Sequence, residues 1–220
     1  YGALLIFDEV VTGFRIGTSG AQGYFGVDPD LTIFGKIIAG GYPGAGGVGG
    51  HKDCMAHLGA GLDSSGKKIP KAMCGGTMAA TPISCVAGYH TLCEIERTNA
   101  CETAGRMGDR LTKGLQEIIK KYRLPFVAFN QGSICHLDNA GTMHFCVDWK
   151  RPWKIPNVLK ETGIRQKEME HMGAAYMAEG IVTLAGSRLY TSAAYTEDMI
   201  DDVLVRFERV LSKCGPVDIS

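Results

Sequence analysis

Residues 30–41, "DLTIFGKIIAGG", place a lysine between an apolar run and a run of glycines. Lysine is almost never fully buried without a partner, and none of the four residues after Lys36 carries a charge. Residues 31–34 have the apolar, β-branched character of a buried strand, and Lys36 follows that strand directly. The stretch therefore predicts either a solvated surface lysine or a site that needs an amine at a strand end.

A second stretch gives the lysine a chemical context. Residues 3–11, "ALLIFDEVV", form a continuous apolar run interrupted by two acids, which is typical of a fully buried parallel strand over 3–7. Asp8 and Glu9 then stand at the carboxyl end of that strand, as Lys36 does at the end of the next. Ligands of open α/β sheets bind outside the carboxyl ends of the strands.

An acid and an amine at this edge indicate one kind of cofactor chemistry. A lysine amine that is neutral attacks carbonyls, and a carboxylate beside a pyridine nitrogen keeps that nitrogen protonated. The residues by themselves therefore point to pyridoxal 5′-phosphate, with Lys36 and Asp8 as the contacts. The alternatives without a cofactor are that Lys36 is a solvated surface lysine and that Asp8 and Glu9 belong to a turn.

The composition excludes several other classes. The chain has 220 residues, formal net charge zero and no basic stripe for nucleic acid. No apolar stretch is long enough to cross a membrane, and residues 1–10 lack the basic start of a signal peptide. Eight cysteines form no C-x-x-C pair and are typical of reduced thiols, so we expect a cytoplasmic protein.

The pattern along the chain predicts an α/β protein. Residues 1–99 are expected to be part of a large cofactor-binding domain with a mostly parallel sheet and flanking helices, and residues 100–220 a small α+β domain. Helices are predicted from 52, from Pro82, over 101–122, over 161–179 and over 197–213, the last with Thr196 as N-cap. Further strands are predicted at 126–132 and 143–149. A buried strand at residue 3 favours a chain that is the C-terminal part of something longer.

The quoted segments strongly resemble a known family. Residues 4–50, with "FDEVVTGFR", "GAQG" and "FGKIIAGG", resemble the core signature of the class III pyridoxal-phosphate aminotransferases, of fold type I. The similarity continues through 74–92, "CGGTMAATPISCVAGYHTL", and 189–204, "LYTSAAYTEDMIDDVL". Within the family the likeness is greatest to the glutamate-1-semialdehyde aminomutases.

The resemblance implies a role for four residues. Asp8 would pair with the pyridine nitrogen, Val10 would pack on one face of the ring, and Lys36 would form the Schiff base and carry the proton. Thr77 would donate to the cofactor phosphate of the partner subunit in a homodimer. The family's phosphate-binding turn and second ring contact belong to an N-terminal half that residues 1–220 do not contain. The sequence after Thr77, "MAATP", also differs from the family's commoner "S-NP".

Other candidate residues have weaker patterns. Cys135, His136, His144 and Cys146 form a C-H-x₇-H-x-C cluster, a spacing that matches no standard structural zinc site, so no metal is expected. Arg188 is a candidate for binding a substrate carboxylate, and Arg15 for a substrate-side contact; both could equally be surface residues. The glycine run contains no G-x-x-x-x-G-K-[ST], so it is not a P-loop.

The predicted function is transfer of an amino group between an amino acid or amino aldehyde and a keto partner. Three chemistries of the family stay open: an aminomutase, an aminotransferase that uses two substrates such as a β-amino acid, and a racemase or epimerase. A different class of hypothesis is a non-catalytic fragment that acts as a dimerisation module. Neither nucleic acid nor a membrane is expected as a partner.

Overall fold

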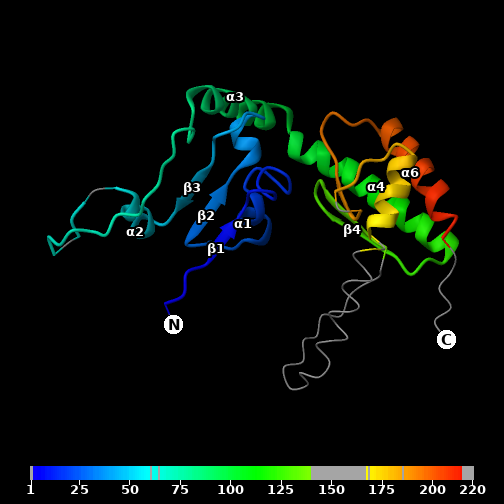
Figure 1. Cartoon of the computed structure of the whole chain (residues 1–220), viewed down its shortest axis with the longest axis horizontal. Coiled ribbons are helices and arrows are strands. Elements are labelled where there is room, and N and C mark those ends of the chain that lie inside the picture. The colour runs from blue at the N-terminus through cyan, green and yellow to red at the C-terminus, as the bar shows by residue number, and fades with distance from the viewer. Residues whose placement is uncertain are drawn as a thin grey trace, which may run out of the picture. The chain divides into compact units, whose positions relative to one another are not determined.

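The chain forms two compact units, Tyr1–Glu102 and Thr103–Ser220. The computed structural model describes residues 2–59, 61–63, 65–139, 167, 169–184 and 186–214. Figure 1 shows a small sheet with helices in each unit. The domain division expected at 99/100 lies close to this one, and the roles assigned to the two domains stay predictions.

The first unit contains a three-stranded sheet in the order β1-β2-β3 (Figure 1). Strand β1 (Ile6–Asp8) runs parallel to β2 (Leu31–Phe34), so both strands predicted at the front of the chain exist. Strand β3 (Gly47–Gly50) is antiparallel to β2, because the glycine-rich stretch 40–46 turns the chain back. The described sheet is therefore mixed, where we expected a mostly parallel one.

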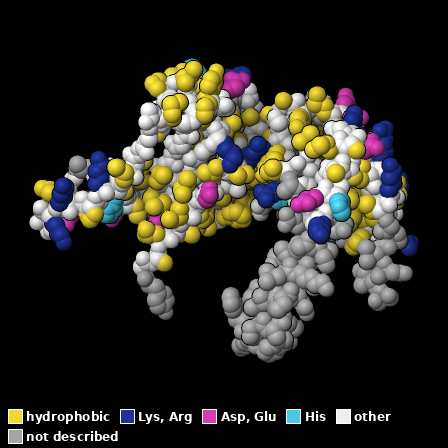
Figure 2. All heavy atoms as spheres, in the orientation of Figure 1, with side chains coloured by type: hydrophobic (Ala, Val, Ile, Leu, Met, Phe, Trp, Pro, Cys, Tyr) yellow, Lys and Arg dark blue, Asp and Glu magenta, His cyan; other side chains and the backbone are white. Residues whose placement is uncertain are grey.

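The expected full burial of the first strand is wrong for the described residues. Leu4, Leu5 and Ile6 are 59%, 44% and 50% exposed. The physical reason is that β1 is an edge strand among the described elements, with β2 as its one neighbour in the sheet. Figure 2 shows hydrophobic side chains at the surface in this part of the chain.

The helices of the first unit are short except for the last. They are α1 (Gly20–Phe25), the 3₁₀ turn η1 (Lys36–Ala39), α2 (Lys52–Met55), η2 (Ala56–Leu58) and α3 (Pro82–Thr98). Pro82 occupies the first turn of α3, as predicted. The helix predicted from residue 52 ends after two turns, because residues 59–61 and Gly66 favour a loop.

The second unit has one core, to which its helices and its sheet both contribute. Helix α4 (Ala100–Tyr122) and helix α6 (Glu197–Leu211) lie where helices were predicted, and each carries an apolar stripe. The sheet has the order β4-β5-β6, from β4 (Val127–Gln131), β5 (Ile134–Asp138) and β6 (Arg188–Tyr190), all antiparallel. The buried core includes Met107, Leu111, Leu115, Ile118, Cys135, Leu137, Tyr176, Leu189, Ile200 and Phe207.

Two local features of this unit agree with the predictions from the sequence, and a third feature was not predicted. The Thr196 hydroxyl accepts a hydrogen bond from the Met199 amide at 3.3 Å, which confirms the N-cap. Residues 169–178 are helical and Gly180 follows with φ +79°, while the expected start at 161 and the strand at 143–149 lie outside the described residues. Strand β5 was not predicted; Gly132, at φ +55°, turns β4 directly into it.

Within the described ranges, no helix has the length and apolar character that crossing a bilayer requires.

The α4 stripe generates a stability prediction. Leu115 is fully buried (0% exposed), so Leu115→Ala removes packing at the centre of this core. We expect the free energy of unfolding of the second unit to fall by about 2–5 kcal/mol. Chemical denaturation followed by far-UV circular dichroism measures it.

The control for this variant lies two residues away on the same helix. Glu117 is exposed, and Glu117→Ala should stay within about 0.5 kcal/mol of the wild type. Equal effects of the two substitutions would show that the α4 stripe does not form the core.

Candidate functional site

The parallel pairing of β1 with β2 brings Asp8 and Lys36 to one edge of the sheet. Asp8 lies opposite Ile33 in the register, and the Glu9 amide donates to the Ile33 carbonyl at 2.9 Å. Lys36 follows Ile33 by three residues, directly after the end of β2. The acid thus lies at the end of β1 and the amine two residues after the end of the adjacent strand β2, while their role as a site stays a prediction.

Val10 lies against the backbone that precedes the lysine. A Cβ atom placed on Gly35 would come within 3.2 Å of Val10 Cγ1, so the two are already in close contact. The Asp8 carboxylate accepts a hydrogen bond from the Val10 amide at 3.0 Å. Asp8, Val10 and Gly35–Lys36 therefore form one local group, in which Asp8 and Lys36 are both exposed.

Lys36 has an unusual backbone conformation. Its φ is +50°, in the left-handed region that residues other than glycine rarely adopt. Gly35 before it is fully extended, and η1 then carries the chain into Gly40, which is again left-handed at φ +59°. Such strained residues occur preferentially at functional sites, so the conformation supports a role for the lysine beyond solvation.

Helix α3 packs tightly on the turn that carries Lys36. A Cβ on Gly88 would lie 1.9 Å from the Ile38 carbonyl oxygen, and one on Gly40 would lie 2.5 Å from the Ala87 carbonyl carbon. Ser84, which is completely buried, donates to the Pro43 carbonyl at 2.6 Å. Glycines 40 and 88 therefore permit a backbone contact that no other residue would allow.

Thr77 lies in an exposed turn after a long extended segment. The turn is closed by the Ala79 amide, which donates to the Gly76 carbonyl at 3.0 Å. The Ala80 amide donates to the Gly44 carbonyl at 2.6 Å, so the turn is attached to the same glycine run that follows Lys36. The structure thus groups Asp8, Val10 and Lys36, and connects the Thr77 turn to them through residues 40–44.

Glu9 is the residue of this region whose importance the sequence did not reveal. Its side chain is 3% exposed, although the sequence presents it merely as the second acid of a pair. Glu9 directly follows Asp8, the last residue of β1, and its place next to an apolar run was the available signal.

The sequence profile of the family described as "Aminotransferase class-III" matches residues 1–183. This chain belongs to the class III aminotransferases. It is 34% identical over 217 residues to glutamate-1-semialdehyde 2,1-aminomutase 1 of Staphylococcus epidermidis, covering 97% of this chain and 45% of that protein. It is also 42% identical over 134 residues to the enzyme of the same name from Macrococcus caseolyticus, covering 61% of this chain and 29% of that protein.

Solved structures agree with the family. An omega-transaminase from Sphaerobacter thermophilus superposes with a TM-score of 0.73 at 27% identity, covering 96% of this chain and 44% of that one. A transaminase described as having PLP bound has the same TM-score and coverage at 24% identity, which shows the fold. The chain thus spans less than half the length of these relatives.

The two candidate arginines lie in different parts of this class III chain. Arg15 follows the site strand, and its amide donates to the Thr12 carbonyl at 3.1 Å. Arg188 belongs to the second unit, where it starts β6 opposite His136. The positive charge of Arg188 and, more strongly, burial lower the pKa of His136. A substrate contact for either arginine stays a prediction.

The zinc alternative is not favoured by the described half of its cluster. Cys135 and His136 are consecutive residues of β5, so their side chains point to opposite faces of the sheet. Cys135 is buried and donates to the Gly108 carbonyl at 3.6 Å, while His136 stacks on Phe129 with ring centroids 4.8 Å apart. His144 and Cys146 lie outside the described residues.

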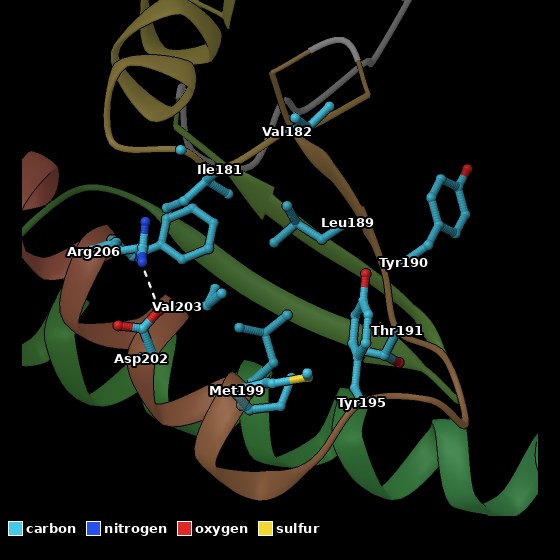
Figure 3. A pocket seen from close by; sticks show the side chains of 14 residues that line it. Ile181, Val182, Leu189, Tyr190, Thr191, Tyr195, Met199, Asp202, Val203 and Arg206 are labelled. Atoms are coloured by element: carbon cyan, nitrogen blue, oxygen red, sulfur yellow. Dashed lines mark hydrogen bonds and ion pairs between the residues drawn. The ribbon is translucent and has the colours of Figure 1, made fainter.

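A pocket of about 480 Å³ lies in the second unit beside β6 and α6 (Figure 3). Its walls are mostly apolar, and its charged members are already engaged: Arg206 donates to Asp202 at 2.8 Å and to the Glu179 carbonyl at 3.0 Å. None of Asp8, Val10, Lys36 or Thr77 lines it. The pocket therefore does not define the candidate site, which rests on the strand edge of the first unit.

The close contact between α3 and η1 yields a second prediction. Gly88→Ala should separate α3 from the Lys36 turn, because the new methyl group meets the Ile38 carbonyl. We expect a loss of about 1–3 kcal/mol in stability, typical of overpacking. Hydrogen exchange of the Gly40 amide, which donates to the Ile37 carbonyl, should become faster.

Gly105→Ala is the matched control. Gly105 is also a helical glycine, but its new Cβ would meet nothing closer than 3.6 Å. Alanine in a helix is more stable than glycine by about 1 kcal/mol, so this variant should gain stability. Similar gains from both substitutions would contradict the close packing of α3 on η1.

The third prediction concerns the thiols. Burial raises the pKa of Cys135 to about 11, so at pH 8 this thiol is protonated as well as inaccessible. In contrast, Cys74 is exposed. Alkylation by iodoacetamide, mapped by mass spectrometry, should modify Cys74 quickly and Cys135 slowly, with or without a chelator. Rapid modification of Cys135 after chelation would restore the zinc alternative.

Proposed function

We propose that this chain is part of a pyridoxal-phosphate-dependent aminotransferase of the glutamate-1-semialdehyde aminomutase type. The single observation that supports this best is the meeting of Asp8, Val10 and Lys36 at one strand edge, with Lys36 in the left-handed conformation. Membership of the class III family and the aminomutase names of the curated relatives agree with it.

The residues present fit this cofactor. When bound, pyridoxal phosphate supplies a carbonyl that condenses with amines and a ring that stabilises negative charge on the adjacent substrate carbon. Val10 offers an apolar side chain for one face of the ring, and Gly35, without a side chain, leaves room for Val10 beside the backbone that precedes Lys36. Asp8 offers a carboxylate at the same edge.

Each residue then has a defined task. The Asp8 carboxylate is the acceptor for the protonated ring nitrogen. The Lys36 amine would hold the cofactor at its carbonyl carbon with loss of water, and once an incoming amine displaces it, its Nζ would carry a proton to and from the reacting substrate carbon. The Thr77 hydroxyl donates to the phosphate, in a homodimer that shares each site between two subunits. A cytoplasmic location belongs to the same proposal.

The family's other chemistries remain alternatives within this proposal. They are transfer between two substrates, including a β-amino acid, and racemisation or epimerisation. A single-substrate assay set against donor–acceptor pairs separates them, because an aminomutase turns over one substrate without a keto partner. A non-catalytic dimerisation module is a further alternative, and the exposed Ile83, Val86 and Tyr89 on α3 are the observation behind it.

Covalent trapping tests the proposed function and is the fourth prediction. The chain, expressed with any coding sequence upstream of Tyr1, is incubated with pyridoxal phosphate, reduced with borohydride and digested. Mass spectrometry should find the label on Lys36, because its amine is the one next to the Asp8 edge. Lys36→Met should abolish the label.

Lys113→Met is the control, since Lys113 is an exposed lysine of α4 with no part in this site. It should leave the labelling of Lys36 unchanged. Label that is distributed over surface lysines, with none specific to Lys36, would refute the aminotransferase proposal and leave the dimerisation module.

A further inference from the structure

We infer that Glu9 is a positioning residue that fixes Asp8 and Val10 for the cofactor ring; the inference rests on the proposed function. Glu9 stands between these two residues in the chain and is 3% exposed. A carboxylate is rarely buried unless it is paired or hydrogen-bonded. Its burial at this strand edge therefore calls for a structural reason.

The Glu9 carboxylate joins the strand end to the loop that follows it. One carboxylate oxygen, Oε2, accepts a short hydrogen bond from the Thr12 hydroxyl. The other, Oε1, accepts from the Gln22 amide, which lies 13 residues away in α1, at 3.2 Å. Residues 9, 12 and 22 are thus held together by a single side chain.

Gly20 makes this arrangement possible. It is buried in the left-handed conformation, at φ +58°, and a Cβ atom at this position would lie 2.7 Å from Glu9 Oε1. The loop backbone therefore lies directly against the carboxylate, and the start of α1 cannot shift without disturbing Glu9. The loop 12–22 and the strand end form one rigid corner.

Glu9 acts on the site through its neighbours in the chain. Glu9 is buried whereas Asp8 before it is exposed, so the two consecutive side chains lie in different surroundings. The Glu9 amide donates to the Ile33 carbonyl at 2.9 Å, and the Glu9 carbonyl accepts from the Gly13 amide at 3.0 Å. With its side chain and backbone both anchored, Glu9 fixes the peptide groups on either side, which belong to Asp8 and Val10.

Two substitutions of Glu9 should differ in effect. Glu9→Ala removes the buried carboxylate that accepts hydrogen bonds from the Gln22 amide and the Thr12 hydroxyl. Glu9→Gln can keep both contacts, because its amide oxygen accepts from the Gln22 amide and its NH₂ group donates to the Thr12 hydroxyl. The conservative variant should therefore rescue the positioning that alanine removes.

The experiment measures the bound cofactor and not the turnover. The chain, with any upstream coding sequence, is loaded with pyridoxal phosphate, and its Kd and the induced circular dichroism of the cofactor band are recorded. We expect Glu9→Ala to raise the Kd about tenfold, the effect of a lost buried hydrogen bond, and to lose most of the induced signal. Glu9→Gln should stay within about threefold of the wild type.

Thr32→Val separates positioning from general loss of stability. Thr32 is a buried polar residue of the same sheet, 6% exposed, on β2. This variant should keep the Kd and the induced signal. If it weakens both as much as Glu9→Ala does, or if Glu9→Ala binds the cofactor like the wild type, the inference about Glu9 is wrong.

Thr12→Val covers the case in which Glu9→Ala does not fold, as far-UV circular dichroism would show. It removes one donor to the carboxylate, and it should still raise the Kd and reduce the induced signal. A wild-type Kd and spectrum for Thr12→Val would then overturn the inference. Failure of the wild-type protein to bind the cofactor would instead refute the proposed function, so the two failures are distinguishable.

Discussion

The hydrogen bond from the Glu9 amide to the Ile33 carbonyl, 2.9 Å long, ends the parallel ladder between β1 and β2. Everything at the candidate site depends on where that ladder ends. Parallel strands present their carboxyl ends at the same edge, so Asp8 at the end of β1 and Lys36 shortly after β2 come to that edge. A shift of one residue would exchange the faces of Asp8 and Glu9 and would bury the wrong acid.

A second constraint fixes the lysine itself. The left-handed conformation of Lys36 costs roughly 1–2 kcal/mol relative to an ordinary helical or extended residue. It persists because η1 is held on one side by α3, through the glycine contacts at 40 and 88 and the buried Ser84 hydroxyl. The glycines therefore allow the backbone of the lysine turn to lie closer to helix α3 than side chains would permit.

Much of this architecture is readable from the sequence, for physical reasons that differ between elements. Helices α4 and α6 are predictable because their apolar stripes bury a core within the chain, and the N-cap at Thr196 is a local hydrogen bond. The positions of Asp8 and Lys36 near strand ends follow from the sequence pattern, while their roles stay predictions. The burial of β1 is not predictable, because burial depends on which neighbours surround a strand and not on the strand alone. Strand β5 was missed although the two-residue Gly132-Ser133 connection between β4 and β5 is a recognised hairpin signal. The role inferred for Glu9 depends on its hydrogen bond with the Gln22 amide, 13 residues away, and a local sequence pattern does not reveal a contact over that separation.

The exposure of Asp8 shows that the position of a site residue and the strength of its charge contact have different origins. The backbone of this chain determines position: the register of β1 with β2, the corner around Glu9 and the packing of α3 on η1 locate the three site residues.

The strength of a charge contact depends instead on its surroundings. Two unit charges at 4 Å interact by about 1 kcal/mol in water but by about 4 kcal/mol in a typical protein surface environment. Since Asp8 is exposed in the described chain, a contact with a protonated ring nitrogen gains strength only when something excludes water from this edge. The cofactor ring, resting on Val10, and any protein segment that covers β1 would both do so. Affinity for the cofactor should therefore increase with each layer that covers this edge, while the geometry of Asp8 and Lys36 is already set by the strands beneath.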